Sequence, residues 1–174
     1  MTRLVRFALP LLPRRLVRFI AAMRSDSGSS LLEVAIILAF LGGPLAVGTA
    51  ESAFLVYDSI EISNAAHAGA MYGMTSNTNA SNSAAITTAA QDEATDFGTN
   101  LSVTPTVFYA CSQAISGTQY ATSASASSAC TGSGDHPLEF IQVAVSDSVT
   151  PPVHLPVLPS TYTLTSTSVM EVEE

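Results

Sequence analysis

The chain has 174 residues, of which 47% are hydrophobic and 11% are charged, and its formal net charge is −8. Its six basic residues are all arginines within the first 24 positions, so the remaining body contains no Lys or Arg. Because neutralising phosphate groups requires cations, this distribution excludes nucleic-acid binding by the body. The high apolar content and low charge density likewise exclude long-range disorder.

Residues 1–28 form a basic leader. The leader carries the six arginines and one acid, Asp26, and therefore a charge of +5, whereas residues 29–174 carry the other thirteen acids. Its apolar pieces are interrupted by Arg and Pro and are too short to span a membrane. A translation start at Met23 in place of Met1 would shorten the leader to six residues.

An apolar run of twenty residues, Leu31–Ala50, follows the leader and contains one charge, Glu33. As a helix this run would extend about 30 Å, the thickness of a bilayer core. We therefore predict a transmembrane helix over residues 29–50. Since the arginines flank only its N-terminal end, the positive-inside rule predicts a cytoplasmic N-terminus and an extracytoplasmic domain of residues 51–174.

Two features of this span concern its packing and its shape. Ala35, Ala39 and Gly43 form a row of small residues on one helix face, which permits close contact with another helix. Pro44 removes one helical hydrogen bond and frees the carbonyl of Phe40, which predicts a kink.

The residues after the span predict a small α+β domain. We expect the first helix to continue to about residue 74, and a second helix to cover Ser83–Phe97 and end at Gly98. Three β-prone segments follow, and Pro105 assigns the first of them to a sheet edge. These segments are Leu101–Tyr109, Leu138–Ser146 and Tyr162–Val172. The predicted fold is a long N-terminal helix packed on a short second helix and a small antiparallel sheet.

Helical spacing gives the outer half of the first helix a packing face and a solvated face. The predicted packing face consists of Ala53, Val56, Tyr57, Ile60, His67, Met71 and Met74. The predicted solvated face consists of Glu51, Asp58 and Glu61.

The two cysteines, Cys111 and Cys130, allow a single intramolecular pairing. Outside the cytoplasm they can close a loop whose 18 intervening residues are rich in Ser, Ala, Thr and Gly. Such a bridge stabilises a fold by about 3 kcal/mol. We therefore predict a disulfide between them.

The junction of leader and span, Asp-Ser-Gly-Ser-Ser-Leu-Leu-Glu at residues 26–33, resembles the processing site of type IV prepilins. The resemblance places the cut after Gly28, where glycine lets a peptidase approach the backbone closely, and makes Ser29 the new N-terminus. Glu33 tolerates the membrane near its interface but needs a cationic partner once subunits pack laterally. The new α-amino group is the only cation near Glu33 in the mature chain.

Residues 28–74 are also similar to the N-terminal signature of TadE-like pilus-assembly proteins. In chain order, that signature consists of a Gly, a Glu, an aliphatic run with Pro, a second Glu and a helix that ends in a characteristic sequence motif. The residues of this chain that match the motif are Asn64, Ala65, Ala66, Gly69, Ala70 and Tyr72. His67 and Ala68 replace the Arg and Glu usual there. Residues 138–172 resemble the family's C-terminal strands more loosely. Val34 stands where small Flp-type pilins have Tyr, which argues against a major filament subunit.

The resemblance implies a pilin-like fold and a minor subunit (pseudopilin) of a tight-adherence pilus and secretion system. Such a subunit is processed by a prepilin peptidase and held in the bacterial inner membrane, and its partners are other pseudopilins and the inner-membrane platform. We expect no enzymatic activity, small-molecule substrate, cofactor or metal, because the sequence has no nucleophile-elbow, P-loop or Cys-x-x-Cys motif.

Two alternatives stay open. One is a secreted binding or adhesion domain released by signal peptidase after Gly48-Thr49-Ala50, and the other is an extracellular domain that keeps its leader as a signal anchor. The three interpretations predict different mature N-termini, namely Ser29, Glu51 and Met1.

Overall fold

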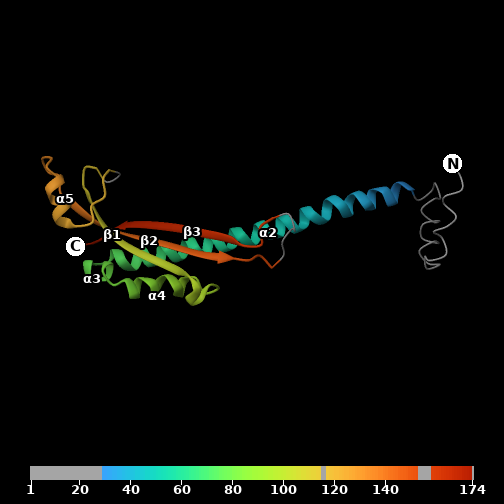
Figure 1. Cartoon of the computed structure of the whole chain (residues 1–174), viewed down its shortest axis with the longest axis horizontal. Helices are drawn as coiled ribbons and strands as arrows, with labels where there is room; N and C mark the ends of the chain where they lie inside the picture. The colour runs from blue at the N-terminus through green and yellow to red at the C-terminus, as the bar shows by residue number, and fades with distance from the viewer. Residues whose placement is uncertain (1–28, 115–116, 153–157, 174) are drawn as a thin grey trace. The chain divides into compact units, whose positions relative to one another are not determined.

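A computed structural model describes residues 29–114, 117–152 and 158–173. The predicted leader, with Gly28 at its end, lies outside the described residues. The elements are α2 (Ser29–Met74), α3 (Asn77–Ala80), α4 (Ser83–Glu93), the 3₁₀ turn η2 (Gly98–Asn100), β1 (Ser102–Cys111), α5 (Ser123–Ala129), β2 (Pro137–Val149) and β3 (Tyr162–Glu171) (Figure 1). The chain divides into two units, Met1–Thr49 and Ala50–Glu174.

The three strands form one antiparallel sheet in the order β1-β2-β3, with β2 in the centre. The register pairs Ser102 with Ser146 in the first ladder and Val149 with Tyr162 in the second. Pro105 lies on the edge strand β1, as predicted, because proline has no N–H to donate to a second neighbour. The structure thus confirms an α+β chain with a long N-terminal helix and a small antiparallel sheet.

The outer half of α2 and the helix α4 cover one face of this sheet (Figure 1). The core between the two layers is built from one face of each element, and most of its helical residues are alanines. Its central members are Ile62, Ala65, Ala66 and Ala70 of α2, Ile86 and Ala90 of α4, and Ile141, Val143 and Val145 of β2. Alternate residues of β2 therefore point to the helices, as the period of a strand requires.

The glycines of α2 bring the helix unusually close to the sheet. A Cβ atom built on Gly73 would lie 2.9 Å from a side-chain carbon of Ile141. A Cβ atom built on Gly69 would lie 3.1 Å from a side-chain carbon of Val143. The small-residue face of α2 is therefore the face that packs.

The predicted packing face of the outer half of α2 is wrong. Val56, Tyr57, Ile60 and Met71 are 50–59% exposed, and His67 is exposed too. Of the predicted face, only Met74 packs against the core. Bulky side chains at the contact would hold the helix away from β2, so the fold buries the neighbouring Ala and Gly stripe and leaves the bulky stripe outside.

The predicted solvated face is wrong at Glu51, and its other two members, Asp58 and Glu61, are only partly exposed. Glu51 is only 2% exposed, whereas it was expected to face water.

The second helix is shorter than predicted. It ends at Glu93, because Ala94 leaves the helical conformation with φ −97° and ψ 69°. The chain then turns so that Phe97 packs against the core, and Gly98 adopts a φ of +55°, which favours glycine. Two short helices, α3 and α5, also occur in segments for which the sequence predicted no element.

The close approach at Gly73 makes a packing prediction. Gly73→Val should lower the free energy of unfolding by about 1–3 kcal/mol, because the added carbons meet Ile141 and the core must shift. Thermal unfolding followed by circular dichroism in detergent would measure the loss. Ser63→Val, at an exposed position of the same helix, controls for the helix propensity of valine. Equal midpoints for the two variants would contradict the close packing.

Candidate functional site

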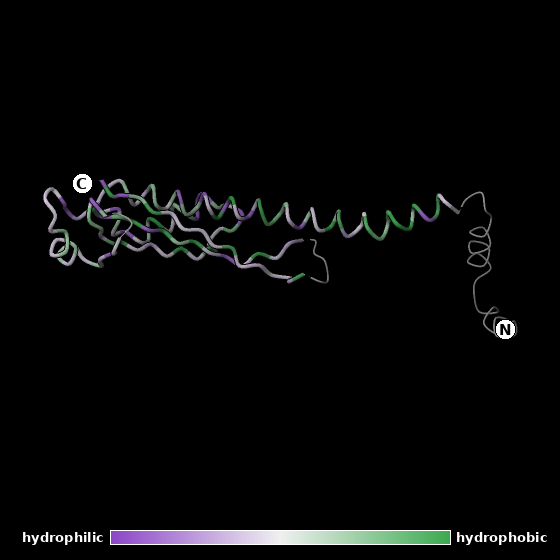
Figure 2. Tube along the Cα trace, turned by 90° about the horizontal axis from the view of Figure 1, so that it is seen from above, coloured by the Kyte–Doolittle hydropathy of each residue, from purple (hydrophilic) through white to green (hydrophobic). Residues whose placement is uncertain are grey.

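The N-terminal part of α2 exposes its apolar side chains. Leu31 is 79% exposed and Phe40 is 80% exposed, and hydrophobic residues follow one another along this part of the helix (Figure 2). The helix is long and apolar enough to cross a membrane, as judged by length and composition, properties that a signal sequence near the N-terminus shares. Such a surface is stable only in lipid or against other apolar surfaces.

The residues predicted for processing and assembly lie at the start of this helix. Ser29 is its first residue, and Glu33 follows one turn later with an exposed side chain. Gly28, the residue expected before the cut, lies outside the described residues. A carboxylate in the first turns of a helix is stabilised by the helix dipole.

The small-residue row Ala35, Ala39 and Gly43 is exposed on α2. The three residues are spaced by four, so they share one helix face, and a Cβ atom built on Gly43 would meet nothing within 4 Å. The row therefore offers space for the close approach of another helix. Pro44 lies next to this row inside α2, and the kink expected there stays a prediction.

A buried carboxylate connects α2 to the last strand. The phenol of Tyr162, the first residue of β3, donates a hydrogen bond of 2.8 Å to Glu51, whose side chain is almost completely buried. This hydrogen bond, together with burial, raises the pKa of Tyr162 above the ordinary value of 10.0. The contact joins residues 111 positions apart in the sequence. Sequence reasoning missed it because nothing in the pattern of α2 identifies a partner so distant.

A second group of acids surrounds Tyr57. The phenol of Tyr57 donates to a carboxylate oxygen of Asp96 at 3.3 Å, and the backbone N–H of Asp96 donates to Glu61 at 2.9 Å. The negative charge of Asp96, with a smaller effect of Glu61, raises the pKa of Tyr57. Burial and the nearby Asp96 raise the pKa of Asp58. Three carboxylates, those of Asp58, Glu61 and Asp96, therefore lie close to one phenol on this surface.

The predicted disulfide is present, and it lies at the C-terminal end of β1. Cys111, the last residue of β1, is bonded to Cys130, which directly follows α5, with a Cα–Cα distance of 5.4 Å. The bridge packs with the buried Ala126 and the half-buried Tyr109 and Tyr120. The loop thus has a small apolar cluster of its own in addition to the covalent link.

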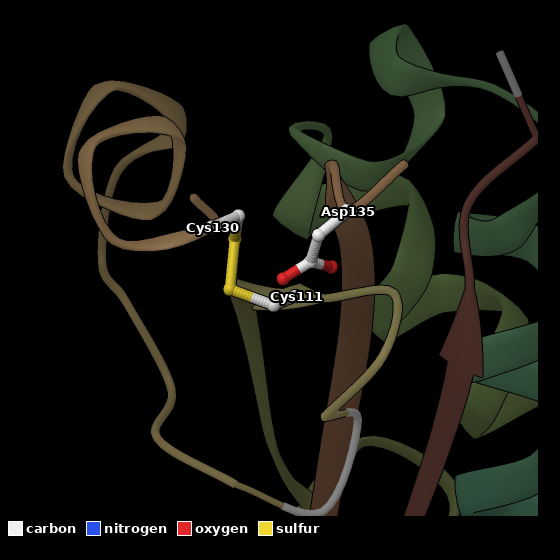
Figure 3. A group of neighbouring side chains, drawn as sticks. All are labelled: Cys111, Cys130 and Asp135. Atoms are coloured by element: carbon white, nitrogen blue, oxygen red, sulfur yellow. A yellow bond between two sulfur atoms is a disulfide. The ribbon is translucent and has the colours of Figure 1, made fainter. Parts of the chain in front are cut away.

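The carboxylate of Asp135 lies beside this disulfide (Figure 3). Its oxygen and the two sulfurs lie within 4.8 Å of one another, a spacing suited to metal ligands. However, sulfurs joined in a disulfide have no thiolate to donate to a metal. Asp135 instead accepts hydrogen bonds from the hydroxyl of Ser112 at 2.9 Å and the backbone N–H of Gln113 at 3.1 Å. Its role here is to fix the turn after β1.

No protein-family model, curated protein or solved structure gives a significant match to this chain. The resemblance to TadE-like proteins therefore depends on the residues and motifs of the sequence.

The buried contact of Glu51 makes a prediction about pH. The folded state favours the protonated phenol of Tyr162, so the stabilisation is complete below pH 10 and is lost as the pH rises through the raised pKa. Tyr162→Phe should lower the unfolding midpoint by a few degrees at neutral pH, because Glu51 loses a donor. The difference from the parent protein should shrink above pH 10. Thermal melts between about pH 7 and 11.5 would measure it, with Tyr120→Phe in the disulfide loop as the control. A difference that does not depend on pH would contradict the assignment.

Proposed function

We propose that this protein is a minor pilin-like component, a pseudopilin, of a tight-adherence or type IV-like pilus assembly and secretion system. A prepilin peptidase removes residues 1–28. Residues 29–50 then anchor the mature protein in the bacterial inner membrane, and residues 51–174 form a pilin-like domain on the extracytoplasmic side. Its partners are other pseudopilins and the inner-membrane platform, and it performs no reaction of its own.

The observation that carries this proposal is the composition of α2. One helix, Ser29–Met74, contains an apolar segment of bilayer length with an acid in its second turn, and its later residues pack on an antiparallel sheet. A protein that assembles by lateral contacts between helices needs such an exposed apolar segment together with a separate folded domain. The open row of Ala35, Ala39 and Gly43 supports a contact of this kind.

Glu33 has a specific role in the proposal. Cleavage after Gly28 would create an α-amino group on Ser29, and no Lys or Arg remains in residues 29–174 to compete with it. Inside a membrane assembly of low dielectric constant, a carboxylate is strongly stabilised by a neighbouring cation. The α-amino group of an adjacent subunit would supply that cation, so processing and assembly would be linked.

The main alternative is an extracellular binding or adhesion domain, released after Ala50 or kept as a signal anchor. The backbone is helical through Gly48 and Glu51, and Glu51 is buried against the domain. Cleavage at this point would require the helix to unwind and the buried carboxylate to move. This observation favours an intact α2 over release at Ala50.

Processing is tested by the residue before the cut. Gly28→Arg should leave a full-length, membrane-bound precursor with a normally folded domain, because a large charged side chain blocks the close approach of the peptidase. Immunoblotting and N-terminal sequencing of protein from the native host would measure this. The parent should begin at Ser29, and Ser27→Ala, one residue earlier, should be processed as the parent is. A mature N-terminus at Glu51 or Met1, or normal cleavage of Gly28→Arg, would exclude the proposal.

Assembly is tested at Glu33. Glu33→Gln should be cleaved and inserted normally but should not associate with its partners, and pilus production should fall strongly, because the neutral amide cannot pair with the α-amino group. Glu33→Asp keeps the charge on a shorter side chain and should be intermediate. Co-purification from membranes and the amount of surface pili would measure the effect. If Glu33→Gln supports pili as well as the parent, Glu33 is only a charge at the membrane interface.

A further inference from the structure

The end of the sheet at Cys111 brings together three side chains of types that bind metals. Cys111 ends β1, Cys130 directly follows α5, and Asp135 lies in the turn before β2. One ligand atom of each residue lies within 4.8 Å of those of the other two, and the carboxylate points toward the sulfurs (Figure 3). Cys111 is 8% exposed, Cys130 is 9% exposed and Asp135 is half-buried. In the oxidised protein the two sulfurs are bonded to each other, so any metal binding belongs to the reduced form.

Contacts other than the disulfide also hold the two cysteines near each other. Tyr109 and Tyr120 exchange two backbone hydrogen bonds of 2.8 Å, which join β1 to the segment before α5. The backbone N–H of Ser112 donates to the carbonyl of His136 at 2.9 Å, which joins the end of β1 to the turn before β2. These bonds do not require the covalent link. The thiols of the reduced chain therefore stay neighbours, with Asp135 beside them.

The carboxylate of Asp135 is already oriented by the protein, which is a second, independent observation. Its Oδ1 atom accepts hydrogen bonds from the hydroxyl of Ser112 and the backbone N–H of Gln113. Carboxylates that bind metals are typically held by such outer hydrogen bonds. Residues 29–174 contain no Lys or Arg that would compete with a metal for the carboxylate or the thiolates.

The three ligand types favour one class of metal ion. Thiolates select soft or borderline ions such as Zn²⁺, whereas Ca²⁺ and Mg²⁺ prefer sites made only of oxygen. Zn²⁺ accepts sulfur and carboxylate ligands together in a tetrahedral arrangement. Three protein ligands leave its fourth position to water.

We propose that the reduced form of this protein binds a zinc ion through the thiolates of Cys111 and Cys130 and the carboxylate of Asp135. The ion joins β1 to the residue after α5 before oxidation, as the disulfide joins them afterwards. The proposal goes beyond a role in pilus assembly and does not depend on cleavage at Gly28, because all three ligands belong to the unit Ala50–Glu174.

The zinc ion and the disulfide exclude each other, since both use the same two sulfurs. Oxidation removes two electrons from the two thiolates, forms the S–S bond and releases Zn²⁺ with its charge unchanged. A disulfide of another molecule accepts the two electrons, takes up two protons and becomes two thiols. Bound zinc therefore slows the oxidation of the reduced chain.

The test uses the full chain in a non-ionic detergent, reduced with a phosphine and then freed of it under argon. Titration with Co²⁺, which has absorption bands that Zn²⁺ lacks, should produce the sulfur-to-cobalt charge-transfer band and the visible bands of a tetrahedral site. Zn²⁺ should remove these bands, and the oxidised protein should not produce them. A reduced protein that gives no such bands would overturn the proposal.

Variants separate the site from a simple pair of thiols. Asp135→Asn should raise the Kd for Co²⁺ more than about tenfold, because losing a ligand costs at least as much as losing an outer hydrogen-bonding partner. Asparagine keeps an acceptor oxygen for Ser112 and Gln113, so the turn is retained. Asp92→Asn removes the same charge from the exposed surface of α4 and should leave the Kd unchanged. Circular dichroism would establish that the variants are folded.

The rate of oxidation by oxidised glutathione gives a readout that does not use cobalt. A zinc concentration that saturates the parent should slow disulfide formation in the parent and in Asp92→Asn, and much less in Asp135→Asn. Equal Kd values for Asp135→Asn and the parent, or a rate of oxidation that zinc does not change, would show that the three residues do not form a zinc site.

Discussion

The close contact between the small-residue face of α2 and the centre of the sheet determines most of the arrangement around it. Gly69 and Gly73 let the helix approach Val143 and Ile141 at distances where a single added carbon meets a side chain. Packing at this distance makes many dispersion contacts over a short length of helix. It also requires the bulky residues of the same helix to lie on the other side. The exposed apolar and aromatic surface of the outer half of α2 is thus a consequence of how tightly its opposite face is packed.

Two further contacts hold the domain at positions away from this central packing. The hydrogen bond from Tyr162 to Glu51 joins the start of β3 to α2, and the bridge from Cys111 to Cys130 closes the loop after β1. The first uses a polar group in a buried position, which is tolerated because a donor satisfies the carboxylate. The second joins a Ser- and Ala-rich segment that has only a small apolar cluster around Ala126. Each contact fixes a segment that the main core does not cover.

The separation of charge along the chain bears on the proposed role of Glu33. Lys and Arg occur only in the leader, so Glu33, Asp58 and Asp96 belong to a body without either residue. A carboxylate in apolar surroundings is stabilised by a hydrogen-bond donor, as at Glu51, or by a positive charge, which no Lys or Arg of the body supplies. For Glu33 the proposed source is the α-amino group of a neighbouring processed subunit.

The sequence by itself determined the long helix to Met74, the three strands with Pro105 at an edge, and the pairing of the cysteines. These features depend on local signals, namely apolar periodicity, the missing N–H of proline, and the presence of only two cysteines. Only the tertiary structure decided which stripe of α2 is buried. Helical spacing defined a bulky stripe and an adjacent Ala and Gly stripe, and the choice depends on how near β2 and α4 can approach.

Dependence on contacts between distant residues also explains why the sequence did not reveal some of the site residues. The burial of Glu51 depends on Tyr162, and the field around Tyr57 depends on Asp96, which reaches it because α4 ends early at Glu93. By contrast, the span and Glu33 were apparent from composition, since a bilayer-length apolar run needs no partner to be recognised. Local chemistry thus determined the elements and the anchor. Contacts between residues far apart in the chain decided which faces are buried and which are exposed, because the energy of such contacts depends on distances that no local pattern encodes.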